Sequence, residues 1–213
     1  MMIAPLPLYT PEHRDGILPI AYFHALARLG LEGLVIVEPA THFMSIGAFG
    51  DATKVIDLAY CRDAGIPVMR REVGGGAVLL GPGQVFYNLV VRRDARRVPR
   101  KIDDAYRVLS QAPVGVYADV GITARYQPIN DLVTESEKKI AGQGAGDIGE
   151  CFCFVGSILN RFDIALMARA LRIDDEAARE RVRTAMDANM SWIERERGAP
   201  AAPELIAASL ARR

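Results

Sequence analysis

The chain has 213 residues, of which 50% are hydrophobic and 24% are charged, a composition typical of a folded globular protein and not of a disordered one. Lys+Arg and Asp+Glu both number 26, so net charge gives no attraction to nucleic acid or to anionic membranes, and neither is expected as a partner. No apolar run approaches the roughly 20 residues of a membrane span. The cysteines, Cys61, Cys151 and Cys153, are an odd and sparse set that suits a reducing compartment, so we expect a cytoplasmic protein.

The first half of the chain predicts helices that alternate with strands. Residues 17–29 carry apolar side chains around most of the helix circumference and predict a largely buried helix. Thr53 is a suitable N-cap for a second helix, which reaches about Ala64 and ends at Gly65. The runs that predict strands are 34–38, 42–46, 66–70, 77–80 and 84–91.

The second half begins with a helix, continues with strands and ends with helices. Residues 101–112 have helical periodicity, which Pro113 ends. Short strands are predicted at 114–120, 122–129, 131–134, 138–142 and 151–159, and helices at 163–171, 175–187 and 203–213. This order predicts an α+β fold with a central, largely antiparallel or mixed sheet flanked by helices, in a single domain over residues 1–213.

Three consecutive glycines form the strongest local feature, in Arg70-Arg71-Glu72-Val73-Gly74-Gly75-Gly76-Ala77-Val78. Glycines permit positive φ and leave the backbone N–H groups open to a ligand. The two arginines supply forked donors suited to a phosphate or a carboxylate. We therefore expect a loop that grips an anionic group, although a hairpin turn with two solvated arginines would also fit.

A second candidate motif combines Asn130-Asp131 with Lys138-Lys139-Ile140-Ala141-Gly142. Asn and Asp at a strand start can bind a phosphate-associated Mg²⁺ or hold an amine. A strand lysine beside small residues can stabilise charge that develops on a phosphate or carbonyl oxygen. The alternative is an ordinary solvent-facing lysine on an edge strand.

Gly144-x-Gly146-x-x-Gly149 has the spacing of a dinucleotide-binding fingerprint, but a strand pattern follows it where the fingerprint requires a helix. We reject that interpretation and predict a mobile loop over a ligand at 142–149. Cys151 and Cys153 lie two apart on a predicted strand, hence on one face, and are expected to be small buried residues.

Taken in order, these motifs resemble the lipoate–protein ligase family, within the wider biotin and lipoate ligase group, in a form without the C-terminal accessory domain. The likeness runs from about residue 17 to the C-terminus. The matching segments are Arg70-Arg71, Gly74-Gly75-Gly76-Ala77-Val78, Asn130-Asp131, Lys139-Ile140-Ala141-Gly142 and Gly156-Ser157-Ile158-Leu159. The resemblance implies the catalytic-domain fold of these ligases, which is similar to that of class II aminoacyl-tRNA synthetases.

The resemblance further implies an ATP-dependent ligase that converts lipoate to lipoyl-AMP and passes the lipoyl group to a lysine of an acceptor lipoyl domain or lipoate-binding protein. Lys139 would be catalytic, and Asp131 would help to place Mg²⁺ or the incoming amine. The implied substrate and adenylate contacts are Arg70, Arg71, Gly74, Gly75, Gly76, Ala77, Val78, Asn130, Asp131, Ala141 and Gly142. ATP and Mg²⁺ would be required, with no tightly bound prosthetic group; whether a separate accessory subunit takes part is open.

The chain departs from the family pattern at several positions. Val73 replaces the usual Ser or Thr, Leu80 and Val155 each replace a histidine, and Gly47-Ala48-Phe49-Gly50 replaces a segment that often holds Gly-Arg and a Gln. Other functions therefore stay open: an octanoyl or lipoyl transferase that uses a cysteine without ATP, a non-catalytic lipoate-binding protein, or a ligase for another acid such as biotin. In one transferase branch the cysteine position corresponds to Phe152, which Cys151 and Cys153 flank.

Overall fold

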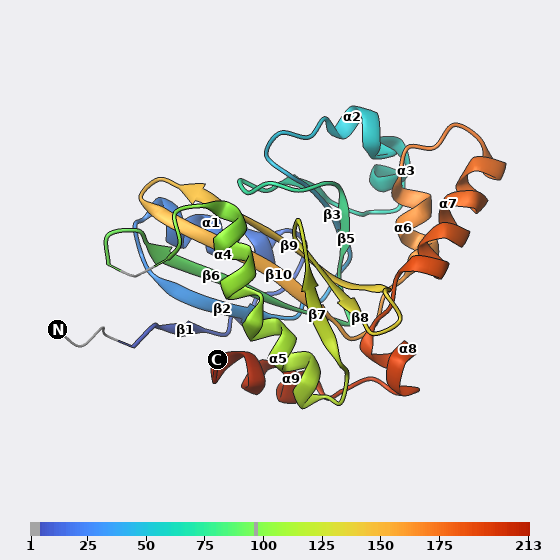
Figure 1. Ribbon diagram of the computed structural model, residues 1–213. Helices are drawn as coiled ribbons and strands as arrows, with labels where there is room; N and C mark the ends of the chain where they lie inside the picture. Colours follow the sequence, from blue (N-terminus) through green and yellow to red (C-terminus); the bar gives the residue numbers. More distant parts are fainter. Residues whose placement is uncertain (1–4, 96–97) are drawn as a thin grey trace.

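A seven-stranded sheet forms the centre of the computed structural model, which describes residues 5–95 and 98–213 (Figure 1). The two strands at one edge of the sheet, the first two in the order given next, run parallel to each other. All other neighbouring strands in this sheet are antiparallel. The spatial order is β1 (Leu8–Tyr9), β2 (Gly33–Val37), β6 (Gln84–Arg92), β10 (Cys151–Leu159), β9 (Lys139–Ile148), β8 (Asp131–Thr134) and β7 (Ala124–Gln127). The predicted fold class, a mixed sheet flanked by helices, is confirmed.

Helices cover both faces of this sheet, because its central strands bury both of their faces. Phe86 and Val90 of β6 pack with α1 (Leu18–Arg28) on one face, and Tyr87 and Val91 pack in the cluster on the other. That second cluster is completed by α4 (Ile102–Leu109), α5 (Gln111–Asp119) and α9 (Pro203–Ala211).

A three-stranded sheet stands beside the α1 face, with β3 (Phe43–Ile46) between β4 (Val68–Arg70) and β5 (Val78–Leu80). Its core also holds side chains of α3 (Leu58–Asp63) and α6 (Ile164–Ala170). The remaining helices are α2 (Ala52–Val55), α7 (Glu176–Asn189) and α8 (Ile193–Arg197). Since β4 and β5 lie on opposite sides of β3, residues 71–77 must pass over the end of β3; we call this segment the glycine loop.

Two element predictions are wrong for local reasons. Residues 114–120 lie in helix α5 and its C-cap, not in a strand, because Pro113 occupies the first helical turn, where no backbone N–H is needed. The helix predicted over 53–64 is two helices capped by Asp51 and Asp57, whose carboxylates accept bonds from the backbone N–H groups of Thr53 and Tyr60. Ile56 separates them in an extended conformation.

The predicted mobile loop at 142–149 is also wrong, since Lys139–Ile148 form one long strand. As expected, no helix follows the glycine pattern, which is not a dinucleotide fingerprint. Within the described residues, no helix is both long enough and apolar enough to cross a membrane.

Candidate functional site

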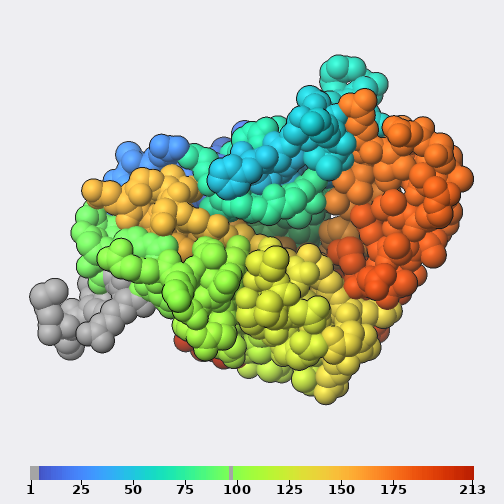
Figure 2. Space-filling view, turned by 45° about the horizontal axis from the view of Figure 1, so that its top comes forward, coloured from blue at the N-terminus to red at the C-terminus, as the bar shows by residue number. Residues whose placement is uncertain are grey.

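A cavity of about 340 Å³ lies between the large sheet, the small sheet, α1 and the α6–α7 region. Figure 2 shows the surface hollowed between the teal segment of the small sheet, the yellow β8–β9 hairpin and the orange α6–α7 helices. This volume is in the range of small-molecule sites. Its lining includes eight of the predicted site residues: Arg71, Gly75, Gly76, Ala77, Val78, Asn130, Lys139 and Gly142. Motifs that are distant in the sequence therefore meet at one cavity.

Arg71 is the buried cation of this site, with 7% of its surface exposed. Its guanidinium donates to the carbonyl oxygens of Gly74, Gly76 and Ser45, so it holds the glycine loop against β3. Burial lowers the pKa of Arg71, and among the described residues no carboxylate pairs with it. A buried guanidinium that lines a cavity and lacks an anionic partner favours an anionic ligand.

Arg70, the other arginine of the motif, does not line the cavity. Its guanidinium donates to the carbonyl oxygens of Gly47, Ala48 and Gly50, so it holds the loop that precedes α2. Gly74 also stays out of the lining and instead offers its carbonyl oxygen to Arg71. The structure therefore gives these two predicted contact residues a part in shaping the loops around the cavity.

Alternate glycines on β9 explain how the glycine loop reaches the large sheet. A Cβ atom on Gly144 would lie 3.2 Å from the carbonyl oxygen of Gly74 and 3.3 Å from the Val73 side chain. Gly146 faces Val73 in the same way, with 3.8 Å of room. Because side chains of a strand alternate between faces, the G-x-G-x-G pattern clears one face of β9 for the loop.

Lys139 opens β9 and places its ammonium 2.7 Å from the Asp131 carboxylate. The pair lies over Gly142, where a Cβ atom would come within 3.3 Å of the lysine Nζ. The backbone of Lys139 is fixed by a hydrogen bond from the Ser191 N–H to its carbonyl oxygen, which ties β9 to the segment after α7. Both charged side chains are partly exposed, so an incoming ligand can contact them.

Asp131 is the only predicted metal ligand, and the described residues contain no cluster of three His, Cys, Asp or Glu side chains that could hold an ion. One carboxylate beside the cavity would fit Mg²⁺ only if the other ligands came from water and from a bound phosphate, which is the usual coordination of that ion. A single carboxylate is too small a donor set to hold a metal ion without ligands from elsewhere.

Asn130 is held by a buried polar network that starts at Gln143. The Asn130 side chain donates to the Gln143 carbonyl oxygen, and the Gln143 N–H donates back to the Asn130 carbonyl oxygen. The Gln143 side chain accepts from Ser110 and donates to Tyr87. Ala141, predicted as a contact, is fully buried in the α4–α5 cluster on the opposite face and does not line the cavity.

The apolar walls of the cavity were not predicted as site residues. At one end they come from α1, β6 and β10, namely Ile20, Phe23, Phe86 and Val155. At the other end they come from the segment around α6 and α7, namely Phe162, Met167, Met186 and Met190. The signal that could have predicted the α1 part of this wall is the near-continuous run of apolar residues at 17–29. A helix that is apolar on most sides can pack one face on the sheet and present another to a cavity.

The three cysteines are all buried, and none lines the cavity. Cys151 and Cys153 pack in the cluster under α1, as expected from their spacing. Burial raises the pKa of all three thiols, that of Cys153 to about 12. A thiol that stays protonated and faces the core is a poor nucleophile.

Two curated proteins are similar to this chain in sequence. Over 145 residues the chain is 30% identical to octanoyltransferase LipM of Exiguobacterium sibiricum, an alignment that covers 65% of this chain and 50% of that protein. Over 146 residues it is 27% identical to lipoate-protein ligase A subunit 1 of Thermoplasma acidophilum, covering 64% of this chain and 54% of that protein. The chain thus spans about half the length of these two curated relatives.

Solved structures share the fold. A structure of a bipartite lipoate protein ligase and its E2 lipoyl domain from Thermoplasma acidophilum matches with a TM-score of 0.84 at 21% identity, over 97% of this chain and 81% of that chain. Biotin protein ligase from Aquifex aeolicus matches with a TM-score of 0.55 at 8% identity, over 97% of this chain and 65% of that chain. Residues 24–213 match the family model described as the lipoyl protein ligase A/B catalytic domain. The chain therefore belongs to the lipoyl protein ligase A/B catalytic-domain family.

Proposed function

We propose that this chain is an ATP-dependent lipoate–protein ligase, which activates lipoate as lipoyl-AMP and transfers the lipoyl group to a lysine of an acceptor lipoyl domain. The observation that carries the proposal is the make-up of the cavity, which presents Arg71 and Lys139 but no thiol. Cationic donors without a cysteine nucleophile suit catalysis by positioning and charge stabilisation.

In the first step the carboxylate of lipoate attacks the α-phosphorus of ATP, and pyrophosphate leaves. Negative charge builds on the phosphate oxygens, and the Lys139 ammonium and the Arg71 guanidinium line the cavity in which these oxygens would lie. The apolar side chains beside α1, such as Phe23 and Phe86, provide a compartment for the acyl chain.

In the second step the amine of an acceptor lysine attacks the carbonyl carbon of the mixed anhydride, and AMP leaves. Lys139 is suited to stabilise the oxyanion in this step, and Asp131 to orient the incoming amine. Mg²⁺, when bound with the nucleotide, would neutralise phosphate charge, and Asp131 is the residue that would hold it.

The partners are part of the same proposal. The structural relative from Thermoplasma acidophilum is described as a bipartite lipoate protein ligase with its E2 lipoyl domain, which supports an acceptor of that kind and a separate accessory subunit. A cytoplasmic location remains the expectation drawn from the cysteine content.

Octanoyl transfer is the second candidate, because several curated relatives are named octanoyltransferase LipM. A transferase of that type would need a cysteine in the cavity. The burial of Cys151 and Cys153 and their raised pKa values favour the ligase.

The test is the intact mass of an apo lipoyl domain after incubation with this protein, lipoate and Mg-ATP, beside an ATP-free control. We expect a shift of one lipoyl group that depends on ATP. Pyrophosphate release without a mass shift would support activation and indicate a missing acceptor or subunit. A shift without ATP from an octanoyl-loaded carrier would establish the transferase, and ligand binding without either product would establish a non-catalytic protein.

A further inference from the structure

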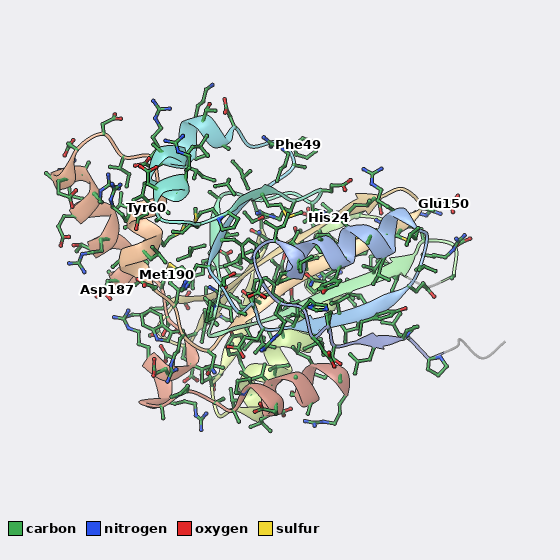
Figure 3. All side chains as sticks on the ribbon, turned by 180° about the vertical axis from the view of Figure 1, so that it is seen from behind. His24, Phe49, Tyr60, Glu150, Asp187 and Met190 are labelled. Carbon is green, nitrogen blue, oxygen red and sulfur yellow. The ribbon has the colours of Figure 1, made fainter. Side chains whose placement is uncertain are left out.

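His24 on α1 forms a side-chain hydrogen bond between that helix and the glycine loop. Its Nε2 accepts a hydrogen bond of 3.1 Å from the backbone N–H of Glu72. The side chain is mostly buried, and its ring meets the neighbouring Phe23 ring edge to face, with centroids 4.3 Å apart. Phe23 lines the cavity, so the turn of α1 that forms part of the cavity wall also contacts the glycine loop through His24. Figure 3 shows His24 on α1, which lies over the rear of the large sheet.

The hydrogen bond determines the protonation state and the tautomer of the His24 imidazole. Nε2 can accept only if it carries no proton, so the neutral tautomer must have its proton on Nδ1. Nδ1 lies 4.0 Å from a carboxylate oxygen of Glu72, which is compatible with a proton on that nitrogen. The geometry thus requires neutral His24 whenever the Glu72 N–H is paired.

The bond acts at the point where the glycine loop leaves the small sheet. The Arg71 N–H donates to the Ile46 carbonyl oxygen, and the Val73 carbonyl oxygen accepts from the Ala48 N–H. Glu72 lies between them, and its N–H turns instead to α1. A break at Glu72 would loosen the segment whose two ends carry Arg71 and Gly74.

We infer that His24 is a positioning residue of the proposed ligase, which fixes the glycine loop through the acceptor nitrogen of its neutral imidazole. This inference rests on the proposed function for its kinetic part only. His24 touches neither Arg71 nor the cavity itself, and it acts through the Glu72 backbone.

The charges around His24 set its response to pH. Burial is the main cause that lowers the pKa of His24 below its usual 6.5, Arg28 on the same helix lowers it further, and Glu72 on the loop opposes both. Arg28 and Glu72 themselves form an ion pair. Under the helix, the Cys153 thiol is neutral at these pH values because its pKa is raised to about 12. Protonation therefore needs a more acidic pH than an ordinary imidazole does, and it converts Nε2 from an acceptor to a donor that faces another donor.

Two variants distinguish the effect of the hydrogen-bond acceptor from the effect of the packed ring. His24→Phe keeps a ring beside Phe23 but has no acceptor, whereas His24→Gln places an amide oxygen near the position of Nε2. We expect His24→Phe to lower kcat/KM for adenylation about tenfold, the effect of one lost buried hydrogen bond, mainly through a higher KM. We expect His24→Gln to recover most of this loss and to remove the rise in KM that we predict for wild type when His24 becomes protonated at acidic pH. His13→Gln, at an exposed site, is the matched control and should keep the wild-type pH profile.

Amide hydrogen exchange of residues 71–76 gives a readout that does not depend on turnover. Protection should fall in His24→Phe, and in wild type at a pH acidic enough to protonate His24, and it should persist in His24→Gln. The inference would be overturned if folded His24→Phe showed the same exchange and kinetics as wild type. It would also be overturned if KM of His24→Gln rose at acidic pH as much as KM of wild type. Absence of adenylation by wild type would overturn the proposed function, whereas the exchange result would still decide the role of His24.

Discussion

Lys139 of β9 and Asp131 of β8 form a 2.7 Å ion pair that lies over Gly142. The glycine leaves room for both side chains, and their partial exposure leaves both available to a ligand. An exposed pair of this kind adds little to the stability of the fold. Its position beside the cavity is therefore better explained by chemistry than by stability.

Replacement of the lysine separates these two roles. Lys139→Met is expected to lower adenylation by at least about 100-fold, because it removes a preorganised charge from the reacting oxygens. The free energy of unfolding should fall by less than about 1 kcal/mol, since the side chain contributes little packing. Pyrophosphate release and a denaturant titration measure the two effects. Lys138→Met is the matched control, because the neighbouring Lys138 does not line the cavity; normal turnover by Lys139→Met would refute the assignment.

The two arginines of the glycine-loop motif should differ in their effects. Arg71→Lys is expected to reduce kcat/KM by about 100-fold, because an ammonium cannot replace the guanidinium fork that spans Gly74, Gly76 and Ser45. Arg70→Met should act on the 47–50 loop and lower the free energy of unfolding by about 1 kcal/mol. Steady-state kinetics and thermal melts of both proteins test the contrast. Equal kinetic losses in the two variants would show that Arg70 also reaches the ligand.

Alternate glycines on β9 give a test of the packing between loop and sheet. Gly144→Ala would push a methyl group against the Gly74 carbonyl and Val73, and we expect a cost of roughly 1–3 kcal/mol in unfolding free energy together with a raised KM. Gly146→Ala has 3.8 Å of room and should be neutral or slightly stabilising. Neither glycine has a positive φ, so alanine fits the backbone at both positions. A tolerant Gly144→Ala would mean that the loop lies farther from β9 in solution.

The cysteines decide between ligase and transferase chemistry. Cys151→Ala and Cys153→Ala should each keep lipoyl transfer within about twofold, and each should cost about 1 kcal/mol of stability from the lost buried sulfur. Intact-mass assays of the acceptor, run with and without ATP, follow the reaction. Complete loss of transfer in either folded variant would favour a thioester intermediate and hence the transferase.

The sequence predicted most strands correctly, because strands depend on local signals. β6 and β10 are long apolar runs bounded by turn residues, and such runs predict buried strands. It failed at α5 and β9, where local signals mislead. Pro113 was taken as a helix end although it sits in a first turn. The glycines of 142–149 were taken as flexible, although Gly142 pairs with β8 and Gly144 and Gly146 pair with β10.

By itself, the sequence determined the mixed sheet with flanking helices and the motif residues that meet at the cavity, because periodicity and residue chemistry are encoded locally. The tertiary structure decided which of these residues face the cavity and which serve packing. Arg70 and Arg71 are adjacent and chemically identical, yet Arg70 donates hydrogen bonds to the 47–50 loop whereas Arg71 lines the cavity. His24 lies far from Glu72 in sequence, and only the packing of α1 against the sheet brings its imidazole to that backbone N–H. Such contacts join distant segments, and no local pattern specifies them.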